Sequence, residues 1–472
     1  MQNIQTTQHN PERVYDIVII GAGVVGCAMA RRFAIEGASV LITEKAADIL
    51  DGASKANSAI LHTGFDAPSG SLELSCIKAG YQEYQEIHER LQLPIMKTGA
   101  IVVAWNGDEE TRLGSLIDHA RTNGIEDIEL LTAKQIMEKE PHLSRSARAG
   151  FHVPREYVID PWTTPYAYLM QAIDNGAHVM RNTEIKSGAF DGNQWRLDTP
   201  HDTIRCRTTI NCAGLYGDYV DATLIGKSNF EIRPRKGQFL VYDKSANALI
   251  SSIILPVPSE TTKGIVVCRT IFGNVLVGPT AEEQKSRSDA SVQTDMLNFL
   301  KEKAEQMVPE LSNCTITATY AGIRPATKSK DYQIQYDTDR HYISVGGIRS
   351  TGLSAALGIA SYVYDEYANA GYKHYAPETL NWPTVQPIAE TEPRDWSKPG
   401  NGGVICHCEL VTRREVIQAL EGPLAANSLG GLKRRTRVTM GRCQGFYCSA
   451  QLSELTAGKF DQPLGIGGSD DK

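Results

Sequence analysis

The chain has 472 residues, of which 41% are hydrophobic and 22% charged, a composition typical of a globular enzyme with roughly two or three domains. Its formal net charge of -7 argues against nucleic acid as a bulk partner, since proteins that bind it carry a clear basic excess. The sequence contains no apolar run of about 18 residues and begins with a polar segment, so it predicts neither a transmembrane helix nor a signal peptide. We expect a cytoplasmic protein, with peripheral attachment to the inner face of the membrane left open.

The chain begins with the pattern of a βαβ unit that holds a dinucleotide. Residues 15–20 predict a buried strand, which runs into Gly21, Gly23 and Gly26 in the spacing G-x-G-x-x-G and then into a helical stretch. The three glycines permit the tight turn, the close approach of backbone to a pyrophosphate, and the packing of helix on strand. Glu44 ends the second strand, where a carboxylate can accept hydrogen bonds from ribose hydroxyls. This pattern alone does not separate FAD from NAD.

Strand and helix signals alternate along the chain to about residue 370. Residues 51–70 are rich in Gly, Ser, Ala and Asn and predict a loop that packs close to a ligand. Helical spacing of apolar residues follows at 71–95 and 109–123, and short alternating stretches such as residues 99–105 and 237–243 predict strands. The alternation indicates an α/β chain.

Three motifs along the chain resemble those of D-amino-acid-oxidase-like proteins, which are FAD proteins of the glutathione-reductase-2 type. They are residues 16–23 (DIVIIGAG), residues 211–214 (NCAG) and residues 346–353 (GGIRSTGL). In this family the middle motif ends a strand beside the adenosine half of FAD. The late motif lies near the flavin ring, at the start of a long helix that matches residues 354–370 here. The resemblance implies that the dinucleotide is FAD.

The same resemblance implies an α/β fold class with a glutathione-reductase-2-type, Rossmann-like FAD-binding domain and an interleaved α+β substrate domain within residues 1–380. The FAD-binding parts are expected at about 14–80, 145–225 and 330–372, and the substrate domain at about 81–144 and 226–329. The residues that it implies around FAD are Gly21, Gly23, Gly26, Glu44, Lys45, Ser54, Asn57, Ser58, Ala213, Gly214, Gly322, Arg349, Gly352 and Leu353.

Residues 55–66, KANSAILHTGFD, are similar to a stretch of one branch of this family. The branch contains FAD-dependent glycerol-3-phosphate dehydrogenases and oxidases and L-2-hydroxyglutarate oxidases, and the similarity covers about residues 14–370. The family places this histidine, His62 here, near the flavin ring. Oxidising a secondary alcohol requires loss of the hydroxyl proton, for which a neutral imidazole is a suitable base, and transfer of a hydride to flavin N5. A structural histidine that hydrogen-bonds a loop is the alternative.

We expect an anionic substrate, because cations stand in the candidate pocket motifs. Arg324 lies in YAGIRP, similar to the family segment that supplies a substrate-binding arginine, and a guanidinium suits bidentate binding of phosphate or carboxylate. Lys263, in TKGIV, resembles the family's lysine–glycine stretch near the flavin, and Arg349 and Ser350 follow the last strand, where we expect them at the ring or the substrate. A solvated surface charge is the alternative for each cation. The PRKGQ stretch also matches the family and is assigned to structure.

The composition changes at residues 381–403, where four prolines and three glycines predict a linker, bounded at about 381–402. Beyond it, residues 403–472 form a small unit. Six cysteines are scattered before this point, and we expect them to be reduced and to pack as small hydrophobic residues.

The last four cysteines form two close pairs. Cys406 and Cys408 are spaced C-x-C, and Cys443 and Cys448 are spaced C-x4-C, with 34 residues between the pairs. Four thiolates suit zinc or an iron–sulfur cluster. Together with the basic segment LKRRTR, these motifs resemble a bacterioferritin-associated-ferredoxin-like [2Fe-2S] domain, over about residues 403–455. The resemblance implies an α-rich domain with a [2Fe-2S] cluster on the four cysteines; zinc at the same cysteines is the alternative, and disulfides are disfavoured in a cytosolic protein.

These features together indicate an FAD-dependent dehydrogenase that oxidises a small anionic secondary alcohol. The resemblance makes glycerol 3-phosphate, oxidised to dihydroxyacetone phosphate, the first candidate substrate. The alternatives are a 2-hydroxy acid such as L-2-hydroxyglutarate, an amine or opine, and a non-catalytic electron-transfer or redox-sensing subunit. We expect the electrons to pass to an acceptor other than NAD, either an acceptor protein or a quinone-linked subunit, and we leave open homo- or hetero-oligomers.

Overall fold

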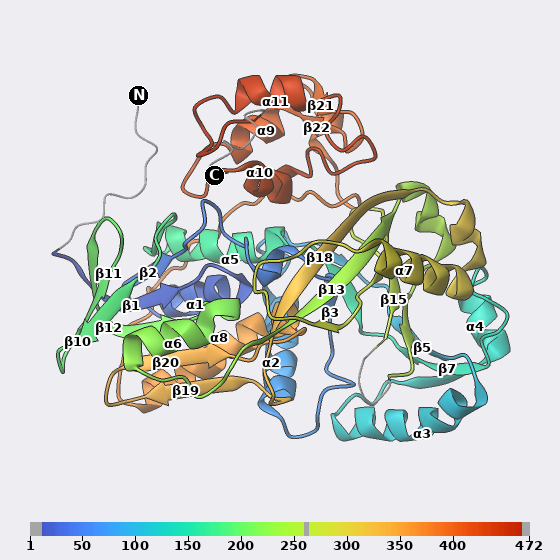
Figure 1. Cartoon of the computed structure of the whole chain (residues 1–472), viewed down its shortest axis with the longest axis horizontal. Coiled ribbons are helices and arrows are strands. Elements are labelled where there is room, and N and C mark those ends of the chain that lie inside the picture. Colours follow the sequence, from blue (N-terminus) through green and yellow to red (C-terminus); the bar gives the residue numbers. More distant parts are fainter. Residues whose placement is uncertain (1–11, 259–263, 465–472) are drawn as a thin grey trace.

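A computed structural model describes residues 12–258 and 264–464 of the chain, and it has three parts (Figure 1). A first sheet with its helices lies at the left of the figure, a second sheet with its helices at the right, and a small helical part above them. The first sheet has parallel strands in the order β9–β2–β1–β12–β20, with β19 antiparallel at the edge and the hairpin β10–β11 antiparallel to β12. Its strands are β1 (Val14–Ile20), β2 (Val40–Thr43), β9 (His178–Met180), β10 (Ser187–Phe190), β11 (Trp195–Asp198), β12 (Thr203–Asn211), β19 (Gln333–Asp337) and β20 (Tyr342–Gly346).

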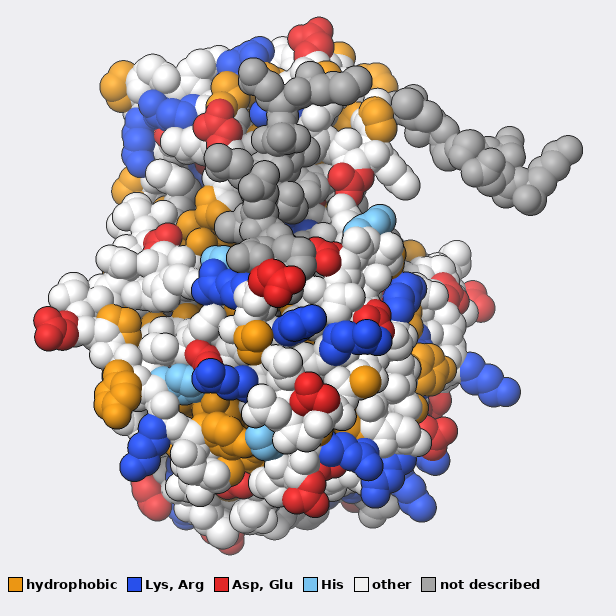
Figure 2. All heavy atoms as spheres, turned by 90° about the vertical axis from the view of Figure 1, so that its left-hand side faces the viewer, with side chains coloured by type: hydrophobic (Ala, Val, Ile, Leu, Met, Phe, Trp, Pro, Cys, Tyr) orange, Lys and Arg blue, Asp and Glu red, His pale blue; other side chains and the backbone are white. Residues whose placement is uncertain are grey.

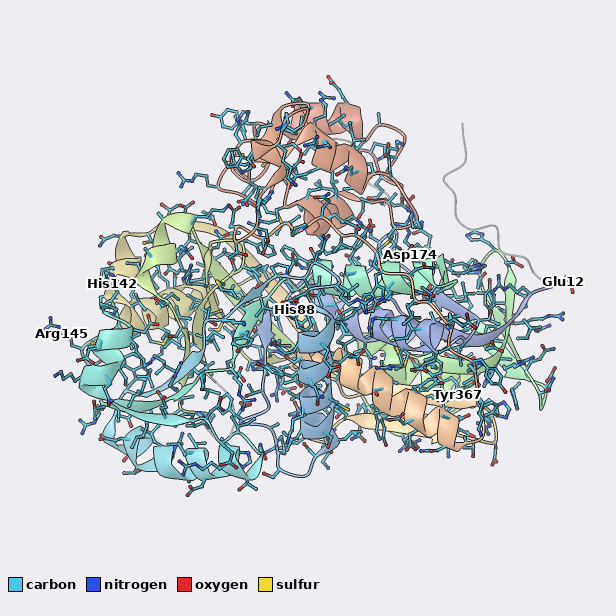
Figure 3. The ribbon with its side chains drawn as sticks, turned by 180° about the vertical axis from the view of Figure 1, so that it is seen from behind. Glu12, His88, His142, Arg145, Asp174 and Tyr367 are labelled. Atoms are coloured by element: carbon cyan, nitrogen blue, oxygen red, sulfur yellow. The ribbon has the colours of Figure 1, made fainter. Side chains whose placement is uncertain are left out.

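Helices rich in small residues pack tightly beside this sheet. They are α1 (Val24–Ile35), α2 (Leu72–Ile87), α5 (Thr163–Asp174), α6 (Gly217–Ile225) and α8 (Gly352–Asn369). Helix α2 crosses α8 so closely that a Cβ on Gly80 would lie 2.3 Å from the Ser354 carbonyl oxygen, and one on Gly358 2.1 Å from that of Cys76. Seen from behind, α2 ends near His88 beside α8 (Figure 3). Glycine at these two positions therefore fixes where α8 begins relative to α2.

The second sheet is antiparallel for most of its width. Its order is β17–β13–β16–β15–β14–β5–β7–β6, with β18 on the other side of β13 and one parallel pair between β14 and β5. Its elements are β5 (Ala100–Ala104), α3 (Gly107–Thr122), β6 (Glu129–Thr132), α4 (Ala133–Lys139), β7 (Ala149–Val153), β13 (Arg233–Tyr242), β14 (Ile253–Pro256), β15 (Val266–Arg269), β16 (Val275–Gly278), β17 (Glu282–Glu283), α7 (Thr294–Met307) and β18 (Ile316–Ala326). Strands β13 and β18 pair along almost their whole length, which makes a rigid platform on this side of the molecule.

A third, small sheet consists of β3 (Ile60–Leu61), β8 (Tyr157–Ile159) and β4 (Ile95–Met96). All pairs in it are antiparallel. It joins two segments that are almost 100 positions apart in the sequence, and Ile60 pairs with Val158 while Leu61 pairs with Tyr157. The register places the residue after β3 opposite the residue before β8.

The proline-rich segment after α8 has little regular structure, as the sequence predicts, but it is packed rather than extended into solvent. Only the short 3-10 turn Asp395–Ser397 interrupts it. Val385, Ile388, Ala389 and Arg394 are all buried. The segment thus packs on the first two parts through its apolar residues and contacts the C-terminal unit through Arg394.

The C-terminal unit lies on top of the other two parts, at the red end of the colour scale in Figure 1. It contains β21 (Val404–Cys406), β22 (Val411–Thr412), α9 (Arg413–Ala419), α10 (Leu429–Thr436) and α11 (Ser449–Leu455). Its small core is formed by Ile405, Val416, Leu432 and Leu452 with their neighbours. A core of this size is marginal alone, so its contacts with the rest of the chain matter for stability.

Those contacts are largely polar. Asp48, which is buried, accepts hydrogen bonds from the backbone N–H of Asn427 (3.1 Å) and the hydroxyl of Ser428 (2.6 Å). Arg437 is buried as well; it donates to Glu409 within its own unit at 2.8 and 2.9 Å and to the side-chain oxygen of Asn274 in the second sheet at 3.3 Å. Paired and hydrogen-bonded charges of this kind fix one docking geometry.

The surface carries no strong charge of one sign on the face shown in Figure 2, where cationic and anionic side chains are interspersed. This agrees with the modest formal net charge of -7. In the described ranges, none of the helices has both the length and the apolar character needed to cross a bilayer.

Candidate active site

The glycine-rich turn after β1 leaves no room for side chains. Gly21 has φ 102°, and a Cβ on it would lie 2.7 Å from the carbonyl oxygen of Cys212 at the end of β12. A Cβ on Gly26 would lie 1.9 Å from the Gly21 carbonyl oxygen. The turn is therefore held against α1 and β12, and it presents the start of α1 without an acidic residue in its first turn. Backbone N–H groups at a helix start of this kind receive a pyrophosphate.

Polar side chains expected around the dinucleotide surround this turn. The Glu44 carboxylate accepts hydrogen bonds from the backbone N–H of Ala22 and of Ala46, both at 2.9 Å, which fixes it at the end of β2. Burial raises the pKa of Glu44, although the two backbone donors oppose that shift. The Ser54 hydroxyl accepts from the backbone N–H of Val24 at 3.0 Å and lies beside Gly23. The glycine-rich turn, the Glu44 carboxylate and the Ser54 hydroxyl thus lie together around one site that fits a dinucleotide.

The remaining expected residues extend from this cradle in two directions. Lys45 lies over the ring of Tyr216, 3.4 Å from its centre, next to the turn formed by Ala213 and Gly214 after β12. On the other side, the Asn57 side chain accepts from the backbone N–H of Ala59 at 2.8 Å and donates to the Ser54 carbonyl at 3.0 Å, and Ser58 is half-buried beside it. The loop is therefore ordered by its own side chains.

His62 is the residue that follows β3, and the register of the small sheet places Glu156 opposite it. Nδ1 of His62 lies 2.8 Å from Oε2 of Glu156. The Glu156 side chain is completely buried, and its other oxygen accepts from the backbone N–H of Thr63 at 2.6 Å and from the Thr63 hydroxyl at 2.7 Å. We assign the proton between them to Nδ1, because a carboxylate accepts there, and this leaves the Nε2 lone pair of the neutral ring available as a base.

Sequence reasoning missed Glu156. It stands in the stretch VPREYVIDP, where an acidic residue among apolar strand residues was the only signal, and it has no motif spacing to His62. The pairing becomes visible only when β3 and β8 are aligned in the sheet.

The start of α8 is tied to the same histidine. The Ser354 hydroxyl accepts from the backbone N–H of His62 at 2.8 Å and donates to the Ile60 carbonyl at 3.1 Å. Gly352 and Leu353, at the start of the helix, are half-buried. The structure thus brings the late motif and the histidine motif together, although they are 292 positions apart.

Arg324 lies on β18, which runs over the loop that carries Asn57. The Tyr320 hydroxyl donates to the Asn57 carbonyl at 2.8 Å, and a Cβ on Gly322 would lie 2.7 Å from the Ala56 carbonyl oxygen. The Arg324 guanidinium crosses the paired strand at Gly237, where a Cβ would lie 2.3 Å from its Nη2. This explains why the PRKGQ stretch needs its glycine.

Most donors of Arg324 are available to a ligand. Among the described residues, the recorded hydrogen bond of its guanidinium is the one to the Thr280 carbonyl, at 3.1 Å. Burial and the charge of Arg235 lower the pKa of Arg324 to about 10, so the group remains cationic at neutral pH. A half-buried cation with free donors is a suitable receptor for a phosphate or carboxylate.

The other expected substrate residues are placed differently. Lys263 lies outside the described residues. Ser350 is exposed, just before the first turn of α8. Arg349 donates to the carboxylate of buried Glu73 at 3.2 Å and to the Lys330 carbonyl. These contacts hold Arg349 beside the start of α2, and its role at FAD or the substrate stays a prediction from the family resemblance.

The four C-terminal cysteines form two thiol pairs. Cys406 interacts with Cys448, and Cys408 interacts with Cys443, so that each pair takes one residue from each motif. The backbone N–H groups around Tyr447 lower the pKa of Cys443, whereas burial and the neighbouring thiols raise the pKa of Cys448 to about 11. Two thiolates for each of two irons is the donor set of a [2Fe-2S] cluster.

Four thiolates also suit a single zinc ion, so the donor set alone leaves zinc as the alternative to the two-iron cluster. The earlier cysteines are unpaired, and all but Cys314 are buried; burial raises the pKa of Cys76, Cys206, Cys212 and Cys268 to about 12.

The basic segment beside the cluster contacts the loop that follows β2. Arg434 donates to the Ile49 carbonyl at 3.0 Å, and Arg435 lies 3.1 Å from the Asp48 carboxylate. In this helix, Lys433 interacts electrostatically with one cluster cysteine, Cys448. The arginines therefore hold the C-terminal unit to the loop that follows β2.

The comparisons with known proteins agree with this geometry. A family model described as FAD dependent oxidoreductase matches residues 16–366, and one described as BFD-like [2Fe-2S] binding domain matches residues 404–457. The chain is 32% identical to glycerol 3-phosphate dehydrogenase of Caloramator mitchellensis over 452 residues, which cover 94% of each chain. It is 26% identical to mitochondrial L-2-hydroxyglutarate dehydrogenase of Caenorhabditis briggsae over 371 residues, 74% of this chain and 85% of that one.

A solved structure shows the same fold. The dithionite-reduced L-α-glycerophosphate oxidase of Mycoplasma pneumoniae, with FAD bound, matches with a TM-score of 0.73 at 27% identity, over 79% of this chain and 99% of that chain. These comparisons confirm the α/β fold, the FAD cofactor, the oxidoreductase class and the [2Fe-2S] domain expected from the sequence. The chain belongs to the FAD dependent oxidoreductase family and carries a BFD-like [2Fe-2S] binding domain on the same polypeptide.

Proposed function

We propose that this enzyme oxidises a small anionic secondary alcohol, with glycerol 3-phosphate, giving dihydroxyacetone phosphate, as the substrate. The observation that carries the proposal is the His62–Glu156 pair, an imidazole whose Nδ1 lies 2.8 Å from a buried carboxylate. The names of two relatives support the substrate: a glycerol 3-phosphate dehydrogenase at 32% identity over 94% of the chain and a glycerol 3-phosphate oxidase at 30% identity over 73% of it.

Each residue has a separate task in this reaction. Arg324 binds the anionic group through its unengaged donors and orients the alcohol carbon. His62 accepts the hydroxyl proton at Nε2, and Glu156 stabilises the imidazolium that forms. FAD, when bound, supplies the acceptor for the hydride that leaves the same carbon. Ser354 holds the backbone of His62 against the start of α8.

For the other expected residues we propose supporting roles. Gly21, Gly23, Gly26, Glu44 and Ser54 hold the adenosine and pyrophosphate half of FAD, around the turn described above. Lys45, Ala213 and Gly214 flank that half, and Asn57, Ser58, Gly322, Gly352 and Leu353 border the flavin half. Lys263 and Ser350 stay predictions from the family resemblance, as second and third substrate contacts.

We further propose that the electrons leave through the [2Fe-2S] cluster, one at a time, to an acceptor protein or a quinone-linked subunit. The family's fusion of a flavin fold to a cluster domain supports this route over direct use of oxygen. We place the enzyme in the cytoplasm, with transient attachment to a membrane-bound acceptor on its inner face.

Anaerobic mixing tests the substrate directly. The FAD-loaded protein is mixed with glycerol 3-phosphate, L-2-hydroxyglutarate or an opine, and the loss of oxidised-flavin absorbance is followed. We expect rapid bleaching with glycerol 3-phosphate and its loss in His62→Ala.

Bleaching by L-2-hydroxyglutarate alone would move the assignment to a hydroxy acid. Bleaching by an opine that survives His62→Ala would indicate amine oxidation, because a neutral amine needs no such base. No bleaching by any of them would indicate an electron-transfer or sensing subunit.

A further inference from the structure

A cavity of about 280 Å³ lies where the flavin-binding part, the proline-rich segment and the cluster domain meet. Its walls include Ile49 from the loop after β2, Trp162 from the start of α5 and Val385 from the proline-rich segment. From the cluster domain, α9 contributes Ala419 and α10 contributes Arg434 and Arg435. None of these residues belongs to the set that surrounds FAD or the substrate. The cavity is therefore a separate site.

Arg435 is the residue that gives this cavity a chemistry. Its side chain is only 8% exposed. Its Nη1 donates to the Gly431 carbonyl at 2.8 Å and lies 3.1 Å from the Asp48 carboxylate. Its Nε and Nη2 are buried and have no hydrogen-bond partner among the described residues. Leaving such donors unpaired costs about 1–3 kcal/mol, more for a charged group, so a buried guanidinium edge of this kind points to a missing acceptor.

The shape of that unpaired edge selects the acceptor. Nε–H and Nη2–H of a guanidinium point in parallel and match the two oxygens of a carboxylate or phosphate. Nη1 is already engaged and the guanidinium lies 5.4 Å from the centre of the Tyr166 ring, so the Nε–Nη2 edge is the part left for a ligand. A single water molecule would satisfy only one of these two donors.

Carboxylates surround the arginines of this region without reaching the open edge of Arg435. Arg181 and Arg435 share the buried Asp48, at N–O distances of 3.4 and 3.1 Å, and Arg434 lies 3.6 Å from the exposed Asp51. Glu415 lines the cavity as well, but one of its oxygens accepts from Arg394 and the other from the Thr412 backbone N–H. The unpaired edge of Arg435, rather than a net charge, therefore favours an anion in the cavity.

Apolar and aromatic side chains form part of the cavity wall, beside polar residues such as Thr384 and Gln418. Trp162 is held by stacking on Phe272, with ring centres 5.2 Å apart and planes 13° apart, and its ring N–H donates to the Lys55 carbonyl at 3.1 Å. Ile49, Val385 and Ala419 continue this wall. A ligand that fits has a charged head and an apolar body, and a volume of about 280 Å³ is near the lower limit for small-molecule sites.

We propose that this cavity binds a small anion with a carboxylate or phosphate head and an aromatic or apolar body. Because three parts of the chain form its walls, the bound anion fastens the cluster domain to the flavin-binding part. The site goes beyond the proposed oxidation and does not depend on the substrate assigned above.

The test uses the full chain loaded with FAD and cluster, with phenyl phosphate and benzoate as probes and inorganic phosphate for the head alone. Calorimetric titration and the thermal midpoint are measured for the wild type, Arg435→Gln, Arg324→Gln and the charge-matched control Arg413→Gln. We expect one site per chain that persists in Arg324→Gln, where the active-site receptor is removed, and a raised midpoint with an aromatic anion. Arg435→Gln is expected to weaken binding about tenfold or more, while Arg324→Gln and Arg413→Gln leave it unchanged. The aromatic probe that binds with the higher affinity shows whether the site prefers a phosphate or a carboxylate head.

A second variant tests the cavity without removing a charge. Ala419→Phe adds a ring on the wall supplied by α9, and it is expected to abolish binding while the flavin and cluster absorbance stay unchanged. The proposal is overturned if no aromatic anion binds, if binding persists in Arg435→Gln and Ala419→Phe, or if Arg324→Gln abolishes it, which would place the anion in the active site.

Discussion

The Nδ1 atom of His62 lies 2.8 Å from Oε2 of Glu156, and the two residues occupy facing positions at the ends of strands β3 and β8. The carboxylate is fully buried and is held by two further hydrogen bonds from Thr63. The imidazole, by contrast, is 20% exposed. The Nδ1 edge of the ring is therefore held by the protein, while part of the ring stays exposed. A base that acts on a bound substrate requires such an accessible edge.

Replacing this carboxylate tests whether it orients the base. In Glu156→Gln the negative charge that stabilises the imidazolium is lost, and we expect kcat to fall about 10²-fold or more. The KM for glycerol 3-phosphate should change little, because Glu156 is assigned no contact with substrate. The acid limb of the pH profile of kcat should also shift to lower pH, since the ring becomes harder to protonate and the base works in its unprotonated form.

Glu129→Gln is the matched control, because Glu129 is exposed and lies 3.9 Å from another histidine, His152. It should leave kcat unchanged. If Glu156→Gln keeps both the wild-type kcat and the wild-type pH profile, the carboxylate has only a structural role.

The close approach of Arg324 to Gly237 predicts a substitution that acts on substrate affinity. A Cβ in Gly237→Ala would lie 2.3 Å from Nη2 of Arg324, so the guanidinium has to move. We expect the KM to rise about tenfold or more, with a smaller change in kcat, measured by steady-state kinetics with a one-electron dye as acceptor. Gly114→Ala on α3 is the control, because a Cβ there meets nothing within 4 Å. Equal KM values in the two variants would contradict the assignment of Arg324 to the anion.

Much of this architecture is readable from the sequence because local patterns determine it. The glycine spacing after β1, the long helix after the late motif and the two cysteine pairs each lie within a short stretch of chain. Their chemistry follows from residue type and spacing alone. The FAD-binding fold and the [2Fe-2S] domain were predictable for this reason.

The remaining features depend on contacts between distant segments. Glu156 becomes the partner of His62 only through the register of a three-stranded sheet. The sequence gives no partner for the Arg349 cation, but in the fold it donates a hydrogen bond to the buried Glu73. The basic segment in α10 belongs to the cluster-domain motif in the sequence, and the fold pairs its arginines with Asp48 and the Ile49 carbonyl. No local pattern encodes these pairings.

The ion pair between Asp243 and Arg442 predicts how acid loosens the cluster domain. Burial alone would raise the pKa of Asp243, but the Ser245 backbone N–H and the Arg442 guanidinium at 2.7 Å outweigh it and lower the pKa from 3.8. A carboxyl whose pKa is depressed by folding stabilises the protein above its unfolded pKa, and this contribution is lost as pH falls through the folded value.

The thermal midpoint of Asp243→Asn should thus lie below that of the wild type near pH 7. The difference should shrink below about pH 4. A constant difference from pH 7 to pH 3 would show that the pair contributes nothing through its charge.

Cluster removal separates the flavin reaction from electron exit. Cys443 is half-buried and interacts with Cys408, so Cys443→Ser removes one ligand of a thiol pair. We expect the iron content to fall from about two atoms per chain towards zero, with loss of the cluster's visible absorbance. Anaerobic reduction of the flavin by glycerol 3-phosphate should stay within about twofold of the wild type, because no cluster ligand lies among the residues around His62. Turnover with a one-electron protein acceptor should fall at least about tenfold, since the route for electrons to leave is broken.

Cys314→Ser, which changes a half-buried cysteine outside the cluster domain, is the control for loss of a thiol. If Cys443→Ser loses iron but keeps full turnover with the acceptor, the cluster is structural and the flavin passes its electrons on directly.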